Sequence, residues 1–445
     1  MKLPNHSSGV GSTRQLARQL LAGLTVSFVA ISLGAAFGVL SGRGALAGIL
    51  SAGVIALITA ALGGTRVQCS GPTAPMTAVT ILLVSAVTGG LLAEHPTVDP
   101  DRFINLVLLL TGVFLIVAAV LRLGRFVRWV PKVVISGFMN GIAVLIWVGE
   151  IQSLFGWWGK NNYAGGIVIN LTVAAMTLIL IVVLPSLLGR VDRRLNSFFP
   201  ATLLAIVIAT AICSFCQLQI QRVSLGASIS SVQDLTTMVA HHFPTEWSLP
   251  LLLLALPFAL QLMMLAYLDT LLTSLVVDRK YQLMHQISAT TRPNKELAAQ
   301  GVANASVALF GGIPGAQATI RSVLILNEGA TMRFAGIMVG VFVLIEMLLF
   351  QDWIGLIPQA VFSGVLLKVG YDVFDWSPIM SYFRRRVRDT GVGDVAQSNS
   401  VSHWAMAFIV GTTLITVFVN LTVAVLLASV LFYLLRDRTH LVDLD

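Results

Sequence analysis

The sequence predicts an all-α membrane protein with several spans, and three observations support this. Apolar residues make up 56% of the 445 residues and charged residues only 11%, whereas soluble domains carry about 25% charged residues. The mean hydropathy is +0.87. Apolar runs repeat from about residue 19 to 436 without a long polar block. We therefore expect one large integral domain in a lipid bilayer.

Fourteen stretches approach the length of a membrane-spanning helix, which needs about 20 apolar residues. They are 19–40, 45–64, 73–90, 104–123, 132–150, 165–188, 199–216, 250–276, 297–311, 316–328, 335–350, 355–374, 402–418 and 420–436. The stretches that begin at 73 and 316 are short and start at Gly/Pro-rich sequence, so we expect half-helices there.

A polar linker divides the stretches into two sets of seven. Because seven is odd, the second set enters the membrane from the opposite side, which is the topology of an inverted repeat. The expected organisation is a cytoplasmic N-terminal tail (1–16), a first repeat (17–216), an extracytoplasmic linker (217–249), a second repeat (250–436) and a short cytoplasmic tail (437–445).

The net charge of +8 does not indicate nucleic acid as a partner. Lys and Arg gather in alternate loops, near 122–132, 190–194, 279–295 and 384–388. An excess of basic residues marks cytoplasmic loops, so we expect a plasma (inner) membrane protein with both termini in the cytoplasm. The sequence has no phosphate-binding P-loop, no nucleophile–base motif and no metal-ligand spacing among its histidines. We therefore expect neither an ATP-driven pump nor an enzyme, and no cofactor.

Two Gly/Pro breaks occupy corresponding positions in the two sets of spans. They are 70–77 (SGPTAPMT) and 311–319 (GGIPGAQAT), each at the start of the third span of its set. A break inside the membrane creates a helix N-terminus with free N–H donors and a partial positive charge. Two facing N-termini can hold a small anion. A matched pair of breaks is the best sequence indication of a transport site.

Ionisable residues inside apolar spans are candidates for function. Asp269 and Thr273 are four residues apart and share one helix face, where their oxygens could bind sodium or Asp269 could accept a proton. Arg321 follows the second break and could attract anions or neutralise Asp269. Glu346 is a weaker candidate for a direct role in function. The location of Lys368 is explained by snorkelling of its side chain.

At this point the sequence resembles a known family. The similarity is carried by 21–42, 63–77, 135–146, 268–278 (LDTLLTSLVVD) and 311–322 (GGIPGAQATIRS). These segments resemble the SulP (solute carrier 26) family of inorganic anion transporters. Within it, they look most similar to the sodium-dependent bicarbonate transporters of cyanobacteria.

The resemblance implies a site and a mechanism. The implied anion site comprises Phe37, Thr73, Ala74, Ala318, Thr319 and Arg321, and the implied sodium site comprises Asp269 and Thr273. The family fold implies a core of spans 1–4 and 8–11 that moves against a gate of spans 5–7 and 12–14, and a homodimer. Most members continue into a STAS domain, whereas only about ten residues follow the last apolar stretch here, so we expect no STAS domain.

These observations together predict a secondary active transporter of bicarbonate or sulfate, with sodium symport by alternating access. Three alternatives remain open at this stage. The first is a nucleobase or uracil permease of the same fold, the second is a proton-coupled sulfate transporter, and the third is an anion channel or a membrane scaffold.

Overall fold

The computed structural model describes residues 10–129, 131–156, 163–191, 201–223, 232–286, 290–388, 402–419 and 421–439. Parts of both expected tails, 1–9 and 440–445, lie outside the described residues, as do the basic residues Arg193 and Arg194.

The described chain is mostly helical. The elements before the linker are α1 (Val10–Leu40), α2 (Ala45–Leu62), β1 (Ser70–Pro72), α3 (Ala74–Ala86), the π-helix η1 (Val87–Leu91), α4 (Pro100–Val120), the 3₁₀ helix η2 (Leu123–Trp129), α5 (Lys132–Phe155), α6 (Ile167–Val191) and α8 (Ala201–Phe215). The later elements are α9 (Val232–His242), α10 (Leu249–His285), α11 (Pro293–Leu309), β2 (Gly315–Gln317), α12 (Thr319–Asn327), α13 (Arg333–Ile354), α14 (Gln359–Val373), α15 (Trp376–Arg388), α16 (His403–Phe418) and α17 (Leu421–Thr439).

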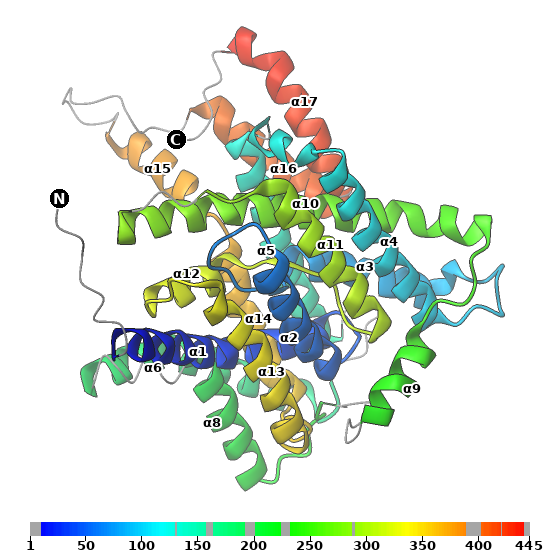
Figure 1. The fold of residues 1–445 in the computed structure, drawn as a ribbon, viewed down its shortest axis with the longest axis vertical. Coiled ribbons are helices and arrows are strands. Elements are labelled where there is room, and N and C mark those ends of the chain that lie inside the picture. The colour runs from blue at the N-terminus through cyan, green and yellow to red at the C-terminus, as the bar shows by residue number, and fades with distance from the viewer. Residues whose placement is uncertain are drawn as a thin grey trace.

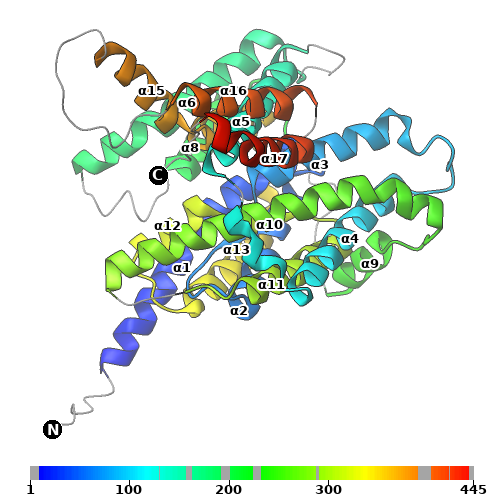
Figure 2. The same cartoon turned by 90° about the horizontal axis from the view of Figure 1, so that it is seen from above.

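The helices form two bundles that lie side by side (Figures 1 and 2). The first bundle contains α1, α2, α4 and α10–α13, with α9 at its edge. The second bundle contains α5, α6, α8, α14, α16 and α17. Helix α3 contacts both, because it packs against α10 on one side and α5 on the other. The chain passes from the first bundle to the second, and then does so again.

Each of the fourteen expected stretches coincides with a helix, but their lengths differ. Eight helices among the described residues are long and apolar enough to cross a membrane, counting α3 and η1 as one. The other six are α8, α11, α12, α14, α16 and α17, which are shorter or more polar. Length and composition therefore identify an integral membrane protein without establishing the number of spans.

Three features of the chain differ from the expectation. The polar linker contains a helix, α9, and the polar stretch between the expected spans 355–374 and 402–418 begins with another, α15. Helix α10 continues nine residues past the expected end at 276, because no glycine or proline interrupts 277–285. Hydropathy did not indicate these helices because it measures apolar content, whereas several polar residues, such as Gln, Lys and Arg, favour helix about as well as Leu does.

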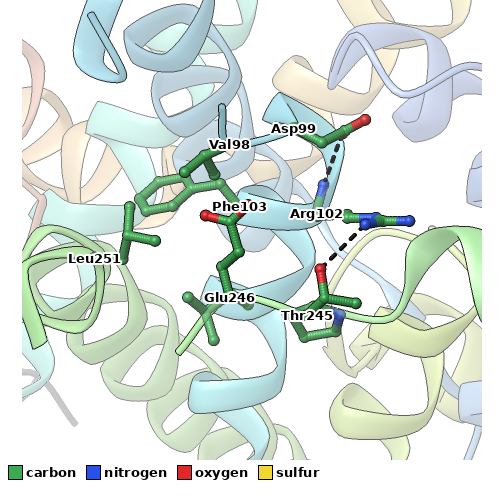
Figure 3. Close-up of a pocket in the computed structure, with 9 residues that line it drawn as sticks. Val98, Asp99, Arg102, Phe103, Thr245, Glu246 and Leu251 are labelled. Atoms are coloured by element: carbon green, nitrogen blue, oxygen red, sulfur yellow. Dashed lines mark hydrogen bonds between the residues drawn. The ribbon is translucent and has the colours of Figure 1, made fainter. Parts of the chain in front are cut away.

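The linker is attached to the first bundle through α4. Asp99 caps this helix by accepting hydrogen bonds from the backbone N–H groups of Asp101 and Arg102 at 2.8 and 3.1 Å. The Arg102 guanidinium donates to the Thr245 hydroxyl at 3.1 Å and to the His241 carbonyl at 3.0 Å. Figure 3 shows the hydrogen bond between Arg102 and Thr245 at the edge of a very small pocket beside Glu246. The linker therefore packs on the first bundle through specific polar contacts.

Candidate functional site

The two Gly/Pro breaks meet in the structure. Strands β1 and β2 pair antiparallel, with Ser70 opposite Gln317 and Pro72 opposite Gly315. Each strand is followed within two residues by a helix that leads away from the pair, α3 from β1 and α12 from β2. The three-residue pairing was not expected, because such short strands carry no alternating apolar pattern.

The starts of α3 and α12 are the two helix N-termini that the sequence predicted. Thr73 precedes α3 and Ala318 precedes α12, and both have extended backbone conformations. Neither helix start carries a side-chain capping hydrogen bond. Amides at the first turn of a helix lack partners within the helix, so both starts can offer donors and a partial positive charge to an anion.

The close approach of the two strands depends on glycine. A Cβ atom on Gly315 would overlap the carbonyl group of Gly71. A Cβ on Gly71 would lie 2.8 Å from a guanidinium nitrogen of Arg321, and Gly71 has a φ of +152°. Side chains at either position would separate the strands or displace Arg321. Gly315 is therefore required by the neighbouring backbone, and Gly71 by the Arg321 guanidinium and its own positive φ.

Arg321 is turned toward this pair of strands. Its Nη2 donates to the Pro72 carbonyl at 2.8 Å, and the residue is 1% exposed. Nε and Nη1 are buried without a hydrogen-bond partner among the described residues. No salt bridge joins Arg321 to Asp269 within the described chain. The guanidinium thus links the start of α12 to the end of β1. Its other two nitrogens could donate hydrogen bonds to a ligand.

A polar stripe on α11 supports both strands. Glu296, Gln300 and Asn304 are spaced i, i+4, i+8 and are all fully buried. Glu296 Oε2 accepts from the backbone N–H groups of Gly64 and Thr65 at 2.7 and 2.9 Å. This stripe was missed by the sequence analysis, although its regular spacing places all three side chains on one helix face.

The other two members of the stripe contact the strands directly. Gln300 donates to the Ser70 hydroxyl at 2.8 Å. Asn304 donates to the Gly315 carbonyl and accepts from the Gly315 N–H, both at 2.9 Å. Irregular backbone inside a membrane needs such protein partners, because lipid offers none. The stripe therefore holds the broken segments in place.

A cavity of about 610 Å³ lies where the two bundles meet and includes the predicted anion-site residues. All six of them line it: Phe37, Thr73, Ala74, Ala318, Thr319 and Arg321. Phe37 contributes an apolar wall from α1, and residues of α6, α8 and α14 face it from the second bundle. The volume is in the range of small-molecule sites.

Asp269 lies between this cavity and a smaller one. It lines both the large cavity and a second cavity of about 130 Å³, which Thr273 and Thr319 also line. Asp269 Oδ2 is buried and has no hydrogen-bond partner among the described residues, although Thr73 and Arg321 lie near enough to interact with its charge. The Thr273 and Thr319 hydroxyls are hydrogen-bonded at 2.7 Å. Carboxylate and hydroxyl oxygens are the ligands that hard cations prefer, so this group fits a sodium ion.

Two charged residues of the cavity were not assigned to it from the sequence. Lys368 and Asp372 line it from α14 and form an ion pair. Their i, i+4 spacing was a usable signal. Glu346, by contrast, lines none of the cavities described above, and its Oε1 accepts a hydrogen bond from Ser27 at 2.7 Å between α13 and α1.

The sequence is similar to known proteins over most of its length. Residues 16–392 match the model of the Sulfate permease family. The chain belongs to this family. It is 30% identical over 433 residues to the bicarbonate transporter BicA of Picosynechococcus sp., covering 93% of this chain and 68% of that protein. It is 24% identical to the chloroplastic sulfate transporter 4.1 of Arabidopsis thaliana, covering 83% of this chain and 53% of that protein.

A solved structure agrees with these relationships. The transmembrane domain of a cyanobacterial bicarbonate transporter BicA superposes with a TM-score of 0.73 at 28% identity, covering 93% of this chain and 98% of that one. The chain spans about two thirds and about half of the length of the two curated relatives above. The family resemblance predicted from the sequence is thus confirmed. Sulfate permease family members are membrane transporters of anions and not enzymes.

Proposed function

We propose that this chain is a secondary active transporter of a small inorganic anion, bicarbonate or sulfate, driven by sodium symport. The observation that carries the proposal is the convergence of two uncapped helix N-termini, at Thr73 and Ala318, on one cavity that also contains Asp269. The helix starts supply positive potential for the anion. The carboxylate and the neighbouring hydroxyls supply oxygen ligands for the cation.

The coupling follows from the shared position of the two sites. Thr319 lines the anion cavity and is hydrogen-bonded to Thr273 in the smaller cavity. A sodium ion beside Asp269 would neutralise a negative charge that otherwise repels the entering anion. Each ligand therefore raises the affinity for the other, and such coupling is reciprocal.

The proposed transport cycle is alternating access, in which the first bundle moves against the second. The cavity between the bundles supports this interpretation, because relative movement would open it to either side. We further propose fourteen spans in two inverted sets, 17–216 and 250–436, with half-helices at α3 and α12. Cytoplasmic termini, a plasma membrane location and a homodimer complete the proposal.

The proposal is tested by uptake into proteoliposomes that contain the purified chain. Labelled bicarbonate, sulfate and uracil are each offered with and without an inward sodium gradient. We expect bicarbonate or sulfate to accumulate, with stimulation by sodium. Asp269→Asn should reduce the sodium-stimulated uptake at least tenfold, since it removes the charged ligand.

The matched control is Asp352→Asn, which changes an exposed aspartate on α13 outside the cavity. It should leave uptake unchanged. Accumulation of uracil but of neither anion would refute the anion proposal. Sodium dependence that survives Asp269→Asn would refute the sodium site while leaving anion transport intact.

A further inference from the structure

The second-bundle side of the cavity carries one charged pair. Lys368 and Asp372 are one turn apart on α14, and both line the cavity. The neighbouring α14 positions that line it are Val365, Val369 and Val373. The ion pair is therefore the polar part of an otherwise apolar helix face that looks toward the starts of α3 and α12.

The cavity contains four charged side chains among its described lining residues. Asp269 and Arg321 come from the first bundle, and Lys368 and Asp372 come from the second. Arg321 is buried and already donates to the Pro72 carbonyl. Lys368, in contrast, is 27% exposed and its partner Asp372 is 37% exposed. Lys368 is thus the cavity cation that an entering anion can reach without disturbing the paired strands.

The pair can exchange partners at low cost. Partly exposed ion pairs contribute little to stability, because water screens them and two long side chains lose freedom. An ammonium group has three donors, so Lys368 can keep Asp372 while it binds an anion. Tyr371 packs near the same ammonium, 5.7 Å from ring centroid to Nζ, and limits where the side chain can move.

We propose that Lys368 is a substrate-recruiting residue of the anion cavity. Asp372 lowers the affinity of Lys368 for the anion, because its carboxylate competes with the anion for the ammonium group. This inference rests on the proposed anion transport. It assigns to the second bundle a role in selecting charge, whereas the starts of α3 and α12 hold the anion at its final position. Lysine suits recruitment, since it is a flexible point charge without the fixed geometry of arginine.

The two residues should have opposite effects on anion affinity. Lys368→Gln removes the attracting charge and should weaken binding of labelled bicarbonate or sulfate about fivefold. Asp372→Asn removes the competitor and should strengthen binding about two- to fivefold. Lys368→Arg keeps the charge and should bind within about twofold of the original protein. Binding is measured on the purified full chain in detergent, with uptake measured in proteoliposomes.

The matched control is Lys295→Gln, which removes an exposed lysine in the first turn of α11, outside the cavity. It should bind both anions normally. Thermal unfolding of each variant verifies that it is folded, and Lys368→Arg provides a second reading if Lys368→Gln unfolds. Equal affinity of Lys368→Gln and the original protein would overturn the inference.

Weaker binding in both Lys368→Gln and Asp372→Asn would also overturn it, because a merely structural pair gives losses of the same sign. These failures leave anion transport by the unmodified protein intact. If the unmodified protein neither binds nor transports either anion, the proposed function fails and the inference fails with it.

Discussion

The first-bundle side of the cavity is built from hydrogen-bonded backbone, whereas the second-bundle side is built from a regular helix face. On the first side, Gly64, Thr65 and Gly315 are bonded to side chains of α11. On the second side, α14 presents valines and one partly exposed ion pair. Under the proposed function, the positions that would hold the anion are fixed by many partners, and the positions proposed to meet it first are fixed by few.

The difference has a physical cause. Broken helices expose backbone N–H and C=O groups that must find partners in the absence of water. A continuous helix such as α14 satisfies its own backbone groups and needs only side-chain packing. Changes that remove polar contacts should therefore cost most on the first side.

The largest expected effect is at Glu296. Glu296→Ala leaves the N–H groups of Gly64 and Thr65 buried without a partner, and each such group costs about 1–3 kcal/mol. We expect a lower thermal unfolding midpoint in detergent together with loss of uptake. Glu94→Ala, at an exposed loop position, is the control. Equal midpoints for the two variants would show that the α11 stripe does not support the strands.

Gly315→Ala tests the close approach of the strands. Its methyl group would overlap the Gly71 carbonyl, and overpacking of this kind costs about 1–3 kcal/mol. The control is Gly411→Ala on α16, where a Cβ meets no atom within 4 Å. That change should stabilise the helix by about 0.5–1 kcal/mol. Denaturation of both variants measures the free energy of unfolding, which should fall for Gly315→Ala and rise for Gly411→Ala. A stabilised Gly315→Ala would contradict the packing argument.

Thr273→Val should have a smaller and more selective effect. It removes the hydrogen bond to Thr319, which contributes about 0.5–1.5 kcal/mol. We expect the sodium concentration for half-maximal uptake to rise about fivefold, while the fold is retained. Thr172→Val, an exposed position on α6, should leave sodium dependence unchanged. An unaltered sodium requirement in Thr273→Val would separate Thr273 from the cation site.

The smallest effect is expected at His242, which contacts the start of the second Gly/Pro break. The His242 ring packs on Gly311, where an added Cβ would overlap it. Burial lowers the pKa of His242 below 6.5, and the charge of Arg43 lowers it further. As the pH falls through about 6.5, the unfolded chain takes up a proton that the folded chain resists. Stability should therefore fall until the lowered pKa is reached.

The unfolding midpoint measured between pH 7.5 and 5.5 checks this sign. His242→Gln should lose less of its midpoint over that interval than the original protein does, because glutamine does not titrate. His95→Gln changes a half-buried histidine in the loop before α4 and is the control. A larger acid loss in His242→Gln would contradict the assignment.

Much of the architecture could be read from consecutive residues. Apolar runs predicted every helix that lines the cavity, and the breaks at 70–77 and 311–319 predicted where α3 and α12 start. Asp269 and Thr273 were predicted as a cation site because a carboxylate in an apolar run is costly. These signals are local, since hydropathy, glycine and proline act on the chain around them.

Other features of the site were decided by tertiary structure. The Arg321–Pro72 bond joins positions 249 residues apart, and no local pattern indicates that Arg321 faces a carbonyl instead of Asp269. Likewise, no local pattern indicates that Glu296 binds backbone N–H groups of another segment. The i, i+4 spacing of Lys368 and Asp372 was visible in the sequence, but the sequence did not show that this helix face lines the cavity. Sequence alone determined that the chain lives in a membrane and where its helices break. Only folding decided which breaks pair and which charges meet, because those depend on contacts between distant segments.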